Sequence, residues 1–230
     1  MKTIGLIGGM SWESTVPYYR LINEMVKARL GGLHSARIIL FSADFHEVER
    51  LQSAAQWDEA GALLAGAARS LESAGAEFLV LCTNTMHKVA HSIESSVSIP
   101  LLHIADATAE SIKQAGVRTV GLLGTRFTME QEFYRDRLKQ NHGIDVLIPG
   151  ETDRYIIHQV IYEELVLGKL NPVSRDEYRR IIGDLVARGV EGIILGCTEI
   201  SLLVKADDSI VPLFDTTSIH AAAAVEWSLG

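Results

Sequence analysis

The sequence lacks the features of a disulfide-rich, nucleic-acid-binding or membrane protein. Its 230 residues include only two cysteines and five prolines, and 21 basic residues are outnumbered by 29 acidic ones. Two cysteines in an intracellular chain rarely form a structural disulfide, and a net charge of −8 without a basic run argues against nucleic acid. No apolar stretch approaches the roughly eighteen residues of a membrane span, and the N-terminus begins with a strand pattern instead of a signal peptide. We therefore expect a soluble cytoplasmic protein.

Short apolar segments alternate with amphipathic ones along the chain. Most of the short segments are continuously apolar and rich in β-branched residues, as parallel strands covered on both faces are. We predict eight strands, at residues 3–7, 37–42, 78–81, 101–104, 119–123, 146–148, 192–195 and 211–214. The segments between them carry apolar residues at helical spacing. This alternation predicts an α/β fold with mostly parallel sheets.

The sequence also contains an internal repeat. Residues 75–85 align without gaps on residues 189–199, an offset of 114 (189 − 75), and residues 3–8 align on residues 119–124, an offset of 116 (119 − 3). Two matches at nearly one offset, about half the chain length, indicate an internal duplication. We therefore predict two homologous halves of the same architecture.

The repeat predicts the domain organisation. No linker rich in serine and glycine separates the halves, and the last segment reads as a strand followed by an alanine-rich helix. By the repeat, this segment corresponds to residues 101–115, so we expect it to fold back onto the first half. The first α/β domain would then contain residues 1–99 plus 210–230 and the second residues 100–209, with the active site in the cleft between them.

Four loops that follow predicted strands are polar or glycine-rich. They are residues 8–15, 83–85, 124–128 and 197–199, and the repeat groups them into two equivalent pairs. Ligands of open α/β sheets bind beyond the carboxyl ends of the strands, so these loops form the expected site. The first loop lacks both the G-x-G-x-x-G pattern and a Gly-Lys-Ser/Thr ending, which argues against a dinucleotide or P-loop site. Its backbone amides suit a small anion such as a carboxylate.

Cys197 is the strongest candidate for a reactive group. It follows an apolar strand and precedes Thr198 and Glu199 near the start of the next helix, whose dipole would favour the thiolate. A cysteine that only packs would more naturally lie inside the apolar run. In the repeat, Thr83 falls on Cys197, and Cys82 lies one residue earlier. Because successive strand residues point to opposite faces, we expect Cys82 to pack inside the fold if Thr83 faces the ligand.

Other polar residues of these loops have two interpretations. Asn84, Thr85 and Thr198 could bind a carboxylate or an ammonium group, or could cap the helices that follow them. His87 lies one turn beyond Thr83 and is typical of a packed or capping residue. No set of histidines and cysteines has the spacing of a zinc site.

Three short motifs lie in the loops that follow predicted strands. They are Gly8-Gly9-Met10, Asn84-Thr85-Met86-His87 and Gly196-Cys197-Thr198-Glu199. Together, at this spacing, they resemble the aspartate/glutamate racemase family of cofactor-independent amino-acid racemases over essentially the whole chain. The resemblance implies two pseudo-symmetric, three-layer domains of the flavodoxin-like or Rossmann-like kind. It also implies a homodimer, a small amino acid as substrate, and neither pyridoxal phosphate nor a metal.

The resemblance implies a mechanism with two thiols on opposite faces of the substrate. One thiolate removes the α-proton, and the other thiol delivers a proton to the far face. This chain departs from the pattern because Thr83 stands where the family has its first cysteine. By the resemblance, the second cysteine acts on the L-enantiomer. We therefore expect Cys197 to deprotonate an L-amino acid and Thr83, directly or through water, to reprotonate the carbanion; in a rival arrangement, Cys82 is the second thiol.

Aspartate and glutamate are the expected substrates. Arg126, at a strand end, is poorly explained as a surface charge and could hold a side-chain carboxylate, as could Arg50 or Gln52. Aspartate-specific relatives place a basic residue in the segment that reads 164–168 here, and Val166 and Leu167 are not basic. A broad-specificity amino-acid racemase is therefore the alternative. The expected substrate-binding residues are Met10, Gln52, Asn84, Thr85, Thr125, Arg126, Thr198 and Glu199.

Other functions are compatible with the same fold. Maleate isomerases, arylmalonate decarboxylases and hydantoin racemases share the fold and a reactive cysteine, but the surroundings of Asn84 and Thr198 favour an amino-acid racemase. A protein that binds a small carboxylate without chemistry is the alternative from a different class. The threonine at position 83 favours that alternative.

Overall fold

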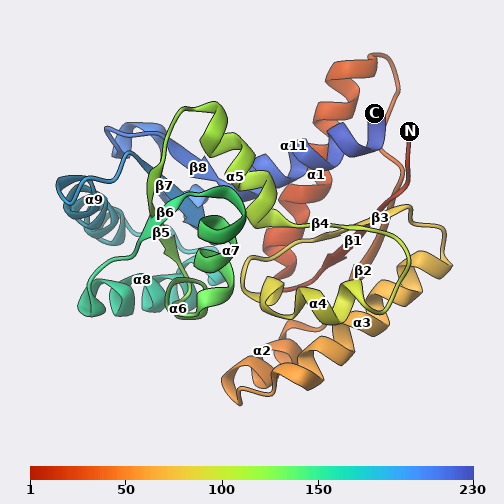
Figure 1. Cartoon of the computed structure of the whole chain (residues 1–230), viewed down its shortest axis with the longest axis horizontal. Coiled ribbons are helices and arrows are strands. Elements are labelled where there is room, and N and C mark those ends of the chain that lie inside the picture. The colour runs from red at the N-terminus through yellow and green to blue at the C-terminus, as the bar shows by residue number, and fades with distance from the viewer. The chain divides into compact units, whose positions relative to one another are not determined.

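The chain forms two four-stranded parallel sheets with helices around them (Figure 1). The computed structural model describes residues 1–230. The strand orders are β2-β1-β3-β4 and β6-β5-β7-β8, so each strand of one sheet has a counterpart in the other. The strands are β1 (Ile4–Gly8), β2 (Ile38–Ser42), β3 (Phe78–Leu81), β4 (Leu101–Leu102), β5 (Thr119–Gly124), β6 (Asp145–Leu147), β7 (Gly192–Gly196) and β8 (Leu213–Asp215). The predicted α/β class with two pseudo-symmetric parallel sheets is confirmed.

Helices connect the strands, as parallel pairing requires. The α-helices are α1 (Trp12–Leu30), α2 (Phe45–Ser53), α3 (Trp57–Ser73), α4 (Ala90–Glu94), α5 (Ile104–Gln114), α6 (Arg126–Glu130), α7 (Glu132–His142), α8 (Glu151–Glu163), α9 (Pro172–Ala187), α10 (Ile200–Leu203) and α11 (Thr216–Leu229). Three short 3-10 helices complete the set: η1 (Thr85–Val89), η2 (Leu165–Leu167) and η3 (Ala206–Asp208).

The chain divides into two compact units, residues 1–104 with 220–230 and residues 105–219. The C-terminal segment that joins the first unit therefore begins at His220 instead of residue 210, because β8 pairs with β7 in the second sheet. Likewise β4 pairs with β3 in the first sheet, although the expected boundary lay at residue 100. Each half of the chain therefore keeps its fourth strand in its own unit. Most of the helix that follows this strand belongs to the other unit: α5 to the second unit and α11 to the first.

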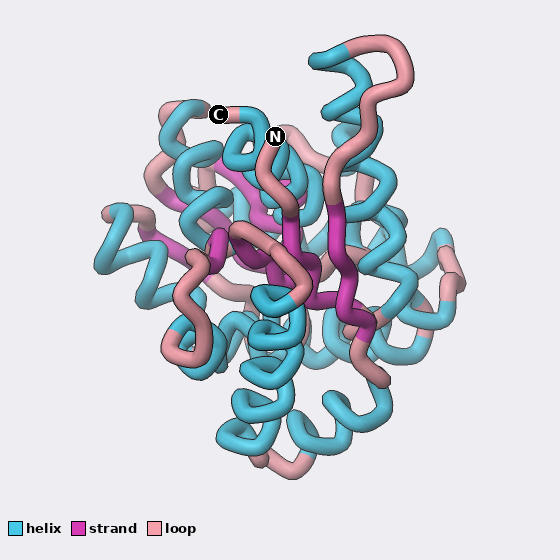
Figure 2. Tube along the Cα trace, turned by 90° about the vertical axis from the view of Figure 1, so that its right-hand side faces the viewer, coloured by secondary structure: helices cyan, strands magenta, loops and turns pink.

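Alternation along β3 decides which helices cover each face of the first sheet. Phe78, Val80 and Cys82 pack with α1 and α11, whereas Leu79 and Leu81 pack with α2, α3 and the segment from η1 to α4. Figure 2 shows the resulting layers, with helices (cyan) on both sides of the strands (magenta). The period of two therefore directs Cys82 into the core beside α1, as the sequence predicts.

Each unit buries a tyrosine against the helix supplied by the other half. The Tyr18 hydroxyl lies 2.9 Å from His220 Nδ1, and both side chains are fully buried. The counterpart of Tyr18 is Tyr134, at an offset of 116 (134 − 18), and its side chain is also fully buried. Burial raises the pKa of Tyr134. The repeat is therefore visible in the two buried tyrosines.

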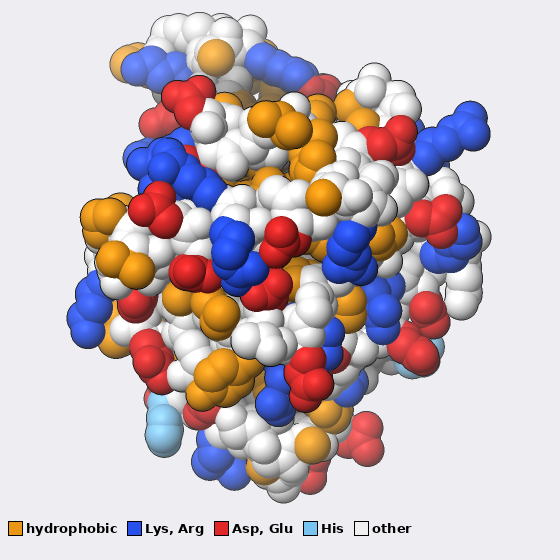
Figure 3. Space-filling model, turned by 90° about the vertical axis from the view of Figure 1, so that its left-hand side faces the viewer, with side chains coloured by type: hydrophobic (Ala, Val, Ile, Leu, Met, Phe, Trp, Pro, Cys, Tyr) orange, Lys and Arg blue, Asp and Glu red, His pale blue; other side chains and the backbone are white.

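Charged side chains of both signs are interspersed on the face shown in Figure 3. In α9, for example, Arg180 pairs with Asp153, Glu177 and Asp184. Exposed pairs of this kind contribute about 0–1 kcal/mol each. This face therefore carries no continuous basic stripe. None of the helices combines the length and the apolar character that crossing a bilayer requires.

The turn after β1 depends on Gly9. Its φ of +89° lies in the left-handed region, and a Cβ atom there would lie 2.2 Å from the carbonyl oxygen of Ala43. The Gly9 N–H donates to Thr15 Oγ1 at 2.8 Å, and Ser11 caps the N-terminus of α1. A residue without a side chain is required here because the backbone after β2 passes directly against the turn.

Replacing Gly9 by alanine should destabilise the protein more than the same change at Gly31. Gly31 also has a positive φ (+73°, with ψ −173°) but has open space around its Cα atom, so Gly31→Ala adds only backbone strain, about 1–3 kcal/mol. Gly9→Ala adds that strain and a backbone clash. Urea denaturation of both variants measures the difference, and equal losses would show that the turn widens without cost.

Candidate functional site

The register of the sheets brings the predicted loops together in pairs. In the first sheet, Ile7 of β1 is opposite Leu81 of β3, so the loops that start at Gly9 and Cys82 leave the same edge. In the second sheet, β5 and β7 end as partners at Gly124 and Gly196, which places the loop at Thr125 beside the loop at Cys197. Both pairs lie at carboxyl ends of strands, where α/β folds bind ligands.

The loop after β7 holds a hydrogen-bonded cluster of three consecutive residues. The Cys197 thiol donates to Glu199 Oε2 at 3.0 Å, and the Thr198 hydroxyl donates to the same oxygen at 2.6 Å. Cys197 is partly buried, and Glu199 is only 4% exposed. One carboxylate oxygen of Glu199 therefore accepts two hydrogen bonds, and one of the two donors is the thiol.

Burial raises the pKa of the Cys197 thiol well above its ordinary value, and the negative charge of Glu199 raises this pKa further. Backbone N–H groups of Glu199 and Thr198 oppose the rise but are weaker. The expectation that a helix dipole favours the thiolate is wrong, because the following helix, α10, spans only Ile200–Leu203. Cys197 is therefore a thiol at neutral pH, with a proton acceptor already in place.

The loop after β3 presents a different chemistry. Thr83 is partly exposed, and the two residues after it, Asn84 and Thr85, are buried. Cys82 is fully buried in the core, its Sγ atom lies 3.8 Å from the Val80 carbonyl, and burial raises the pKa of its thiol. The structure therefore separates Cys82 from the loop surface that Thr83 reaches.

His87 connects the Thr83 loop to the start of α5. Its Nδ1 atom lies 2.7 Å from the Thr83 carbonyl oxygen, and its Nε2 atom lies 3.2 Å from the N–H of Ile104. The sequence assigned His87 no functional role. The repeat gave no signal for this role, because the counterpart of His87 is Ser201 (201 − 87 = 114), which bonds the Thr198 carbonyl at 3.1 Å.

Met10 and Gln52 lie in the first unit, close to its apolar core. Met10 is 6% exposed and belongs to the cluster that includes Leu51 and Met86. Gln52 is 4% exposed, and its Nε2 atom donates to the Met86 sulfur at 2.8 Å. Thioether sulfur is a weak acceptor, so the Gln52 amide would lose little free energy by donating to a substrate carboxylate oxygen instead.

Thr125 and Arg126 begin α6 in the second unit. Thr125 caps the helix by accepting from the Thr128 N–H at 3.3 Å. The Arg126 side chain is 58% exposed and lies 3.8 Å from Glu130. His158 was not expected from the sequence, and its Nδ1 atom accepts from the Arg126 N–H at 3.4 Å. Burial lowers the pKa of His158, and the positive charge of Arg126 lowers this pKa further. Arg126 therefore holds a positive charge that a carboxylate could reach.

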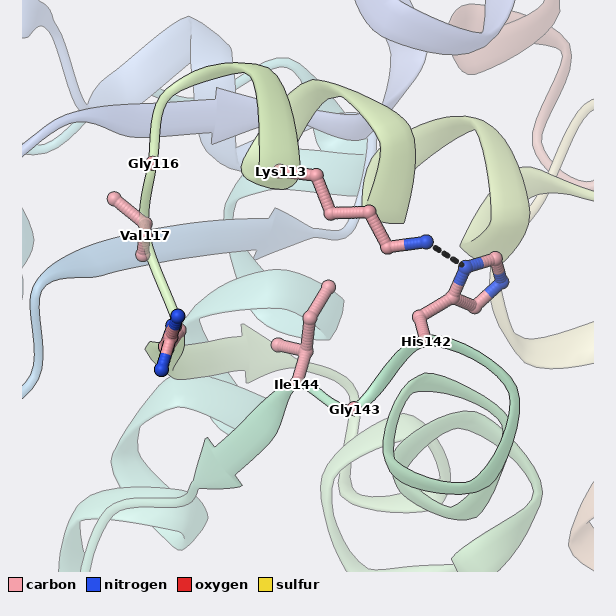
Figure 4. Close-up of a pocket in the computed structure, with 7 residues that line it drawn as sticks. Lys113, Gly116, Val117, His142, Gly143 and Ile144 are labelled. Atoms are coloured by element: carbon pink, nitrogen blue, oxygen red, sulfur yellow. Dashed lines mark hydrogen bonds between the residues drawn. The ribbon is translucent and has the colours of Figure 1, made fainter.

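A cavity of about 370 Å³ lies at the other edge of the second sheet (Figure 4). Arg118 directly precedes β5 and Ile144 directly precedes β6, so the cavity is at the amino ends of the strands, away from Cys197. In Figure 4, Lys113 Nζ lies 3.0 Å from His142 Nδ1. The cavity is therefore separate from the loops described above. No group of three or more His, Cys, Asp or Glu side chains is arranged to hold a metal ion.

Known proteins with the same architecture are numerous. The crystal structure of a candidate Asp/Glu racemase from Yersinia pestis is 63% identical, with a TM-score of 0.95 and 100% of both chains covered. An aspartate racemase homologue from Pyrococcus horikoshii OT3 is 35% identical, with a TM-score of 0.87 and 100% of both chains covered. The broad specificity amino-acid racemase RacX of Bacillus subtilis (strain 168) is 22% identical over 234 residues, which cover 96% of each chain. The model of the Asp/Glu/hydantoin racemase family matches residues 7–224. The chain therefore belongs to the Asp/Glu/hydantoin racemase family and is an isomerase of the amino-acid racemase type.

Proposed function

We propose that the protein is an amino-acid racemase without pyridoxal phosphate that acts on L-aspartate and L-glutamate. In this proposal Cys197 removes the α-proton, and the carbanion is reprotonated from the side of Thr83. The observation that carries the proposal is the hydrogen bond between the Cys197 thiol and Glu199, at the loop position that the repeat equates with Thr83. The cytoplasmic location and a homodimer are expectations from the family resemblance.

The base in this proposal is the Cys197–Glu199 pair. When Cys197 Sγ takes the α-proton, the proton of the thiol passes to Glu199 Oε2 across 3.0 Å. The sulfur therefore does not have to become a free thiolate before the reaction. The S–H and Cα–H bonds break, new S–H and O–H bonds form, and the Cα–H electron pair stays on the substrate. Because the carboxylate accepts the thiol proton as the sulfur takes the α-proton, a thiol of raised pKa can act as a base in this pair.

Thr83 makes the two faces of the substrate unequal. The residue that the repeat equates with Glu199 is Thr85 (199 − 85 = 114), so Thr83 has no equivalent carboxylate to take its proton. A threonine hydroxyl is a very poor base near neutral pH, but it can deliver a proton that solvent then replaces. The excess proton on Glu199 returns to solvent, so the cycle is balanced.

An acidic substrate is supported by the exposed charge of Arg126 and by the aspartate racemase homologue with 35% identity. The similarity to RacX supports broad specificity as the alternative. The free energy of carbanion formation is large, because an α-proton is far less acidic than a thiol with its ordinary pKa of about 8.5. Contacts to the substrate carboxylates therefore have to stabilise the developing charge.

Exchange of the α-hydrogen in D2O tests the proposal. Proton NMR with L- and D-aspartate, L- and D-glutamate and neutral amino acids, without added pyridoxal phosphate, should show faster loss of the α-proton from an L- than from a D-enantiomer. Cys197→Ser should reduce this exchange by 10²–10⁴-fold, roughly the contribution of a positioned base. Cys82→Ala serves as the control and should retain exchange, because Cys82 is in the core. A protein that binds aspartate tightly without exchange is a binding protein, and the racemase proposal is then wrong.

Thr83→Cys should give the far face a base. Its thiol, with an ordinary pKa near 8.5, is far more acidic than a hydroxyl, so α-hydrogen exchange from the D-enantiomer should rise by about tenfold or more. Exchange from the L-enantiomer, which depends on Cys197, should change by only a few fold. Equal exchange from both enantiomers in the unmodified protein would contradict the asymmetry.

Glu199→Gln should change thiol ionisation and catalysis in opposite directions. Removal of the negative charge lowers the pKa of Cys197, so ultraviolet thiolate absorbance should appear at lower pH than in the unmodified protein. Racemisation should nevertheless fall by about 10²-fold, because the acceptor of the thiol proton is lost. Cys197→Ser retains only Cys82, so its absorbance gives the contribution of Cys82 to be subtracted. A higher thiol pKa in Glu199→Gln would show that the carboxylate does not act on the sulfur.

A further inference from the structure

We propose that His87 is a positioning residue that fixes Thr83 and thereby decides how often the carbanion is inverted instead of returned to its starting enantiomer. This inference rests on the proposed function, because it assigns Thr83 to the reprotonating side. His87 does not touch the reacting atoms. It acts through the backbone of Thr83, whose carbonyl oxygen lies 2.7 Å from His87 Nδ1.

The two hydrogen bonds of His87 define its tautomer. The N–H of Ile104 can only donate, so His87 Nε2, 3.2 Å away, is the acceptor. The proton of the neutral ring is then on Nδ1, where it is donated to the Thr83 carbonyl. Only this neutral form satisfies both backbone groups, because a doubly protonated ring would set a donor against the Ile104 N–H. The ring is therefore a fixed strut between residues 83 and 104.

The anchor at the other end of this strut is held by a second buried histidine. His220 Nε2 lies 2.9 Å from the Leu102 carbonyl, and a carbonyl can only accept, so Nε2 carries the proton. His220 Nδ1 therefore accepts from the Tyr18 hydroxyl at 2.9 Å. Burial lowers the pKa of His220 to about 4, which keeps this ring neutral near pH 7. The end of β4, two residues before the Ile104 N–H that His87 binds, is thus held by buried groups.

In the other half, the residue equivalent to His87 does not form such a strut. Ser201, the counterpart of His87, bonds the Thr198 carbonyl three residues earlier and reaches no further along the chain. Cys197 does not need one, because its thiol is oriented by its own hydrogen bond to Glu199. Thr83 is the second residue after the end of β3 and lies in an irregular segment. His87 therefore fixes the position of Thr83, just as the hydrogen bond to Glu199 fixes the position of the Cys197 thiol.

Placement matters more for Thr83 than for a thiol. A hydroxyl is a weak acid, so it protonates the carbanion in competition with return from Cys197 only when it is well aligned. A displacement of about 1 Å can reduce a positioned step by roughly 10²-fold. Loss of the strut should therefore lower inversion while leaving proton removal by Cys197 almost unchanged. A residue that merely stabilised the fold would lower both together.

Two substitutions separate the two hydrogen bonds of His87. In His87→Asn the amide N–H takes the place of Nδ1–H and can still donate to the Thr83 carbonyl. In His87→Gln the longer side chain reaches the position of Nε2 and can accept from Ile104, but the donor to Thr83 is lost. His91→Gln changes an exposed histidine of α4 in the same way and is the matched control.

The experiment measures, in D2O with L-aspartate, the initial rates at which deuterated L-aspartate and deuterated D-aspartate form. His87→Gln should raise the ratio of deuterated L to deuterated D by about tenfold to 10²-fold. His87→Asn keeps the donor to the Thr83 carbonyl and loses only the anchor at Ile104, so it should raise the ratio less than His87→Gln does, and His91→Gln should not differ from the unmodified protein. The same folded molecules form both products, so a lower yield of folded protein does not change the ratio.

The outcomes distinguish the two proposals. If the unmodified protein incorporates no deuterium into any amino acid, the proposed function is wrong, and the role of His87 in inversion is wrong with it. If the unmodified protein exchanges and inverts, but His87→Gln loses both rates in proportion, the proposed function stands and His87 is only structural. A ratio that rises equally in His87→Asn and His87→Gln would also overturn the inference, because the hydrogen bond to the Thr83 carbonyl, which His87→Asn keeps, would then have no effect of its own.

Discussion

Parallel pairing of the central strands is the constraint on which the rest of the structure depends. β1 pairs with β3, and β5 with β7, so every connection has to cross a sheet face before the next strand begins. As a result, the loops that carry Met10 and Thr83 leave one edge of the first sheet, and those that carry Thr125 and Cys197 leave one edge of the second. Strand alternation then separates adjacent residues: Cys82 packs with α1 and α11, while Thr83 is partly exposed.

The two halves share a backbone but differ in how they handle protons. The loop after β7 has a thiol whose proton is already directed at a buried carboxylate. The loop after β3 has a hydroxyl, and the position equivalent to Glu199 is a threonine. Burial raises the pKa of Cys197, and the charge of Glu199, which accepts the hydrogen bond of the thiol, raises this pKa further.

Buried histidines compensate for the missing side-chain order on the threonine side. His87 and His220 lie in the first unit with ring centroids 6.0 Å apart; His220 binds the Leu102 carbonyl at the end of β4, and His87 binds the Ile104 N–H at the start of α5. Neutral imidazole suits this task because it offers one donor and one acceptor on opposite sides of a rigid ring. The exchanged helix α11 contributes His220, so the exchange of chain ends also fixes the end of β4.

The sequence by itself determined the eight strands, the parallel α/β class, the equivalence of Thr83 with Cys197 and the burial of Cys82. These follow from local apolar periodicity and from the repeat, both of which are properties of neighbouring residues. Only the tertiary structure decided that the exchanged segment begins at His220, that the Cys197 thiol is protonated, and that His87 is bound to Ile104. Strand pairing, desolvation and hydrogen bonds between distant segments set these features, and no local pattern of residues records which buried groups will meet.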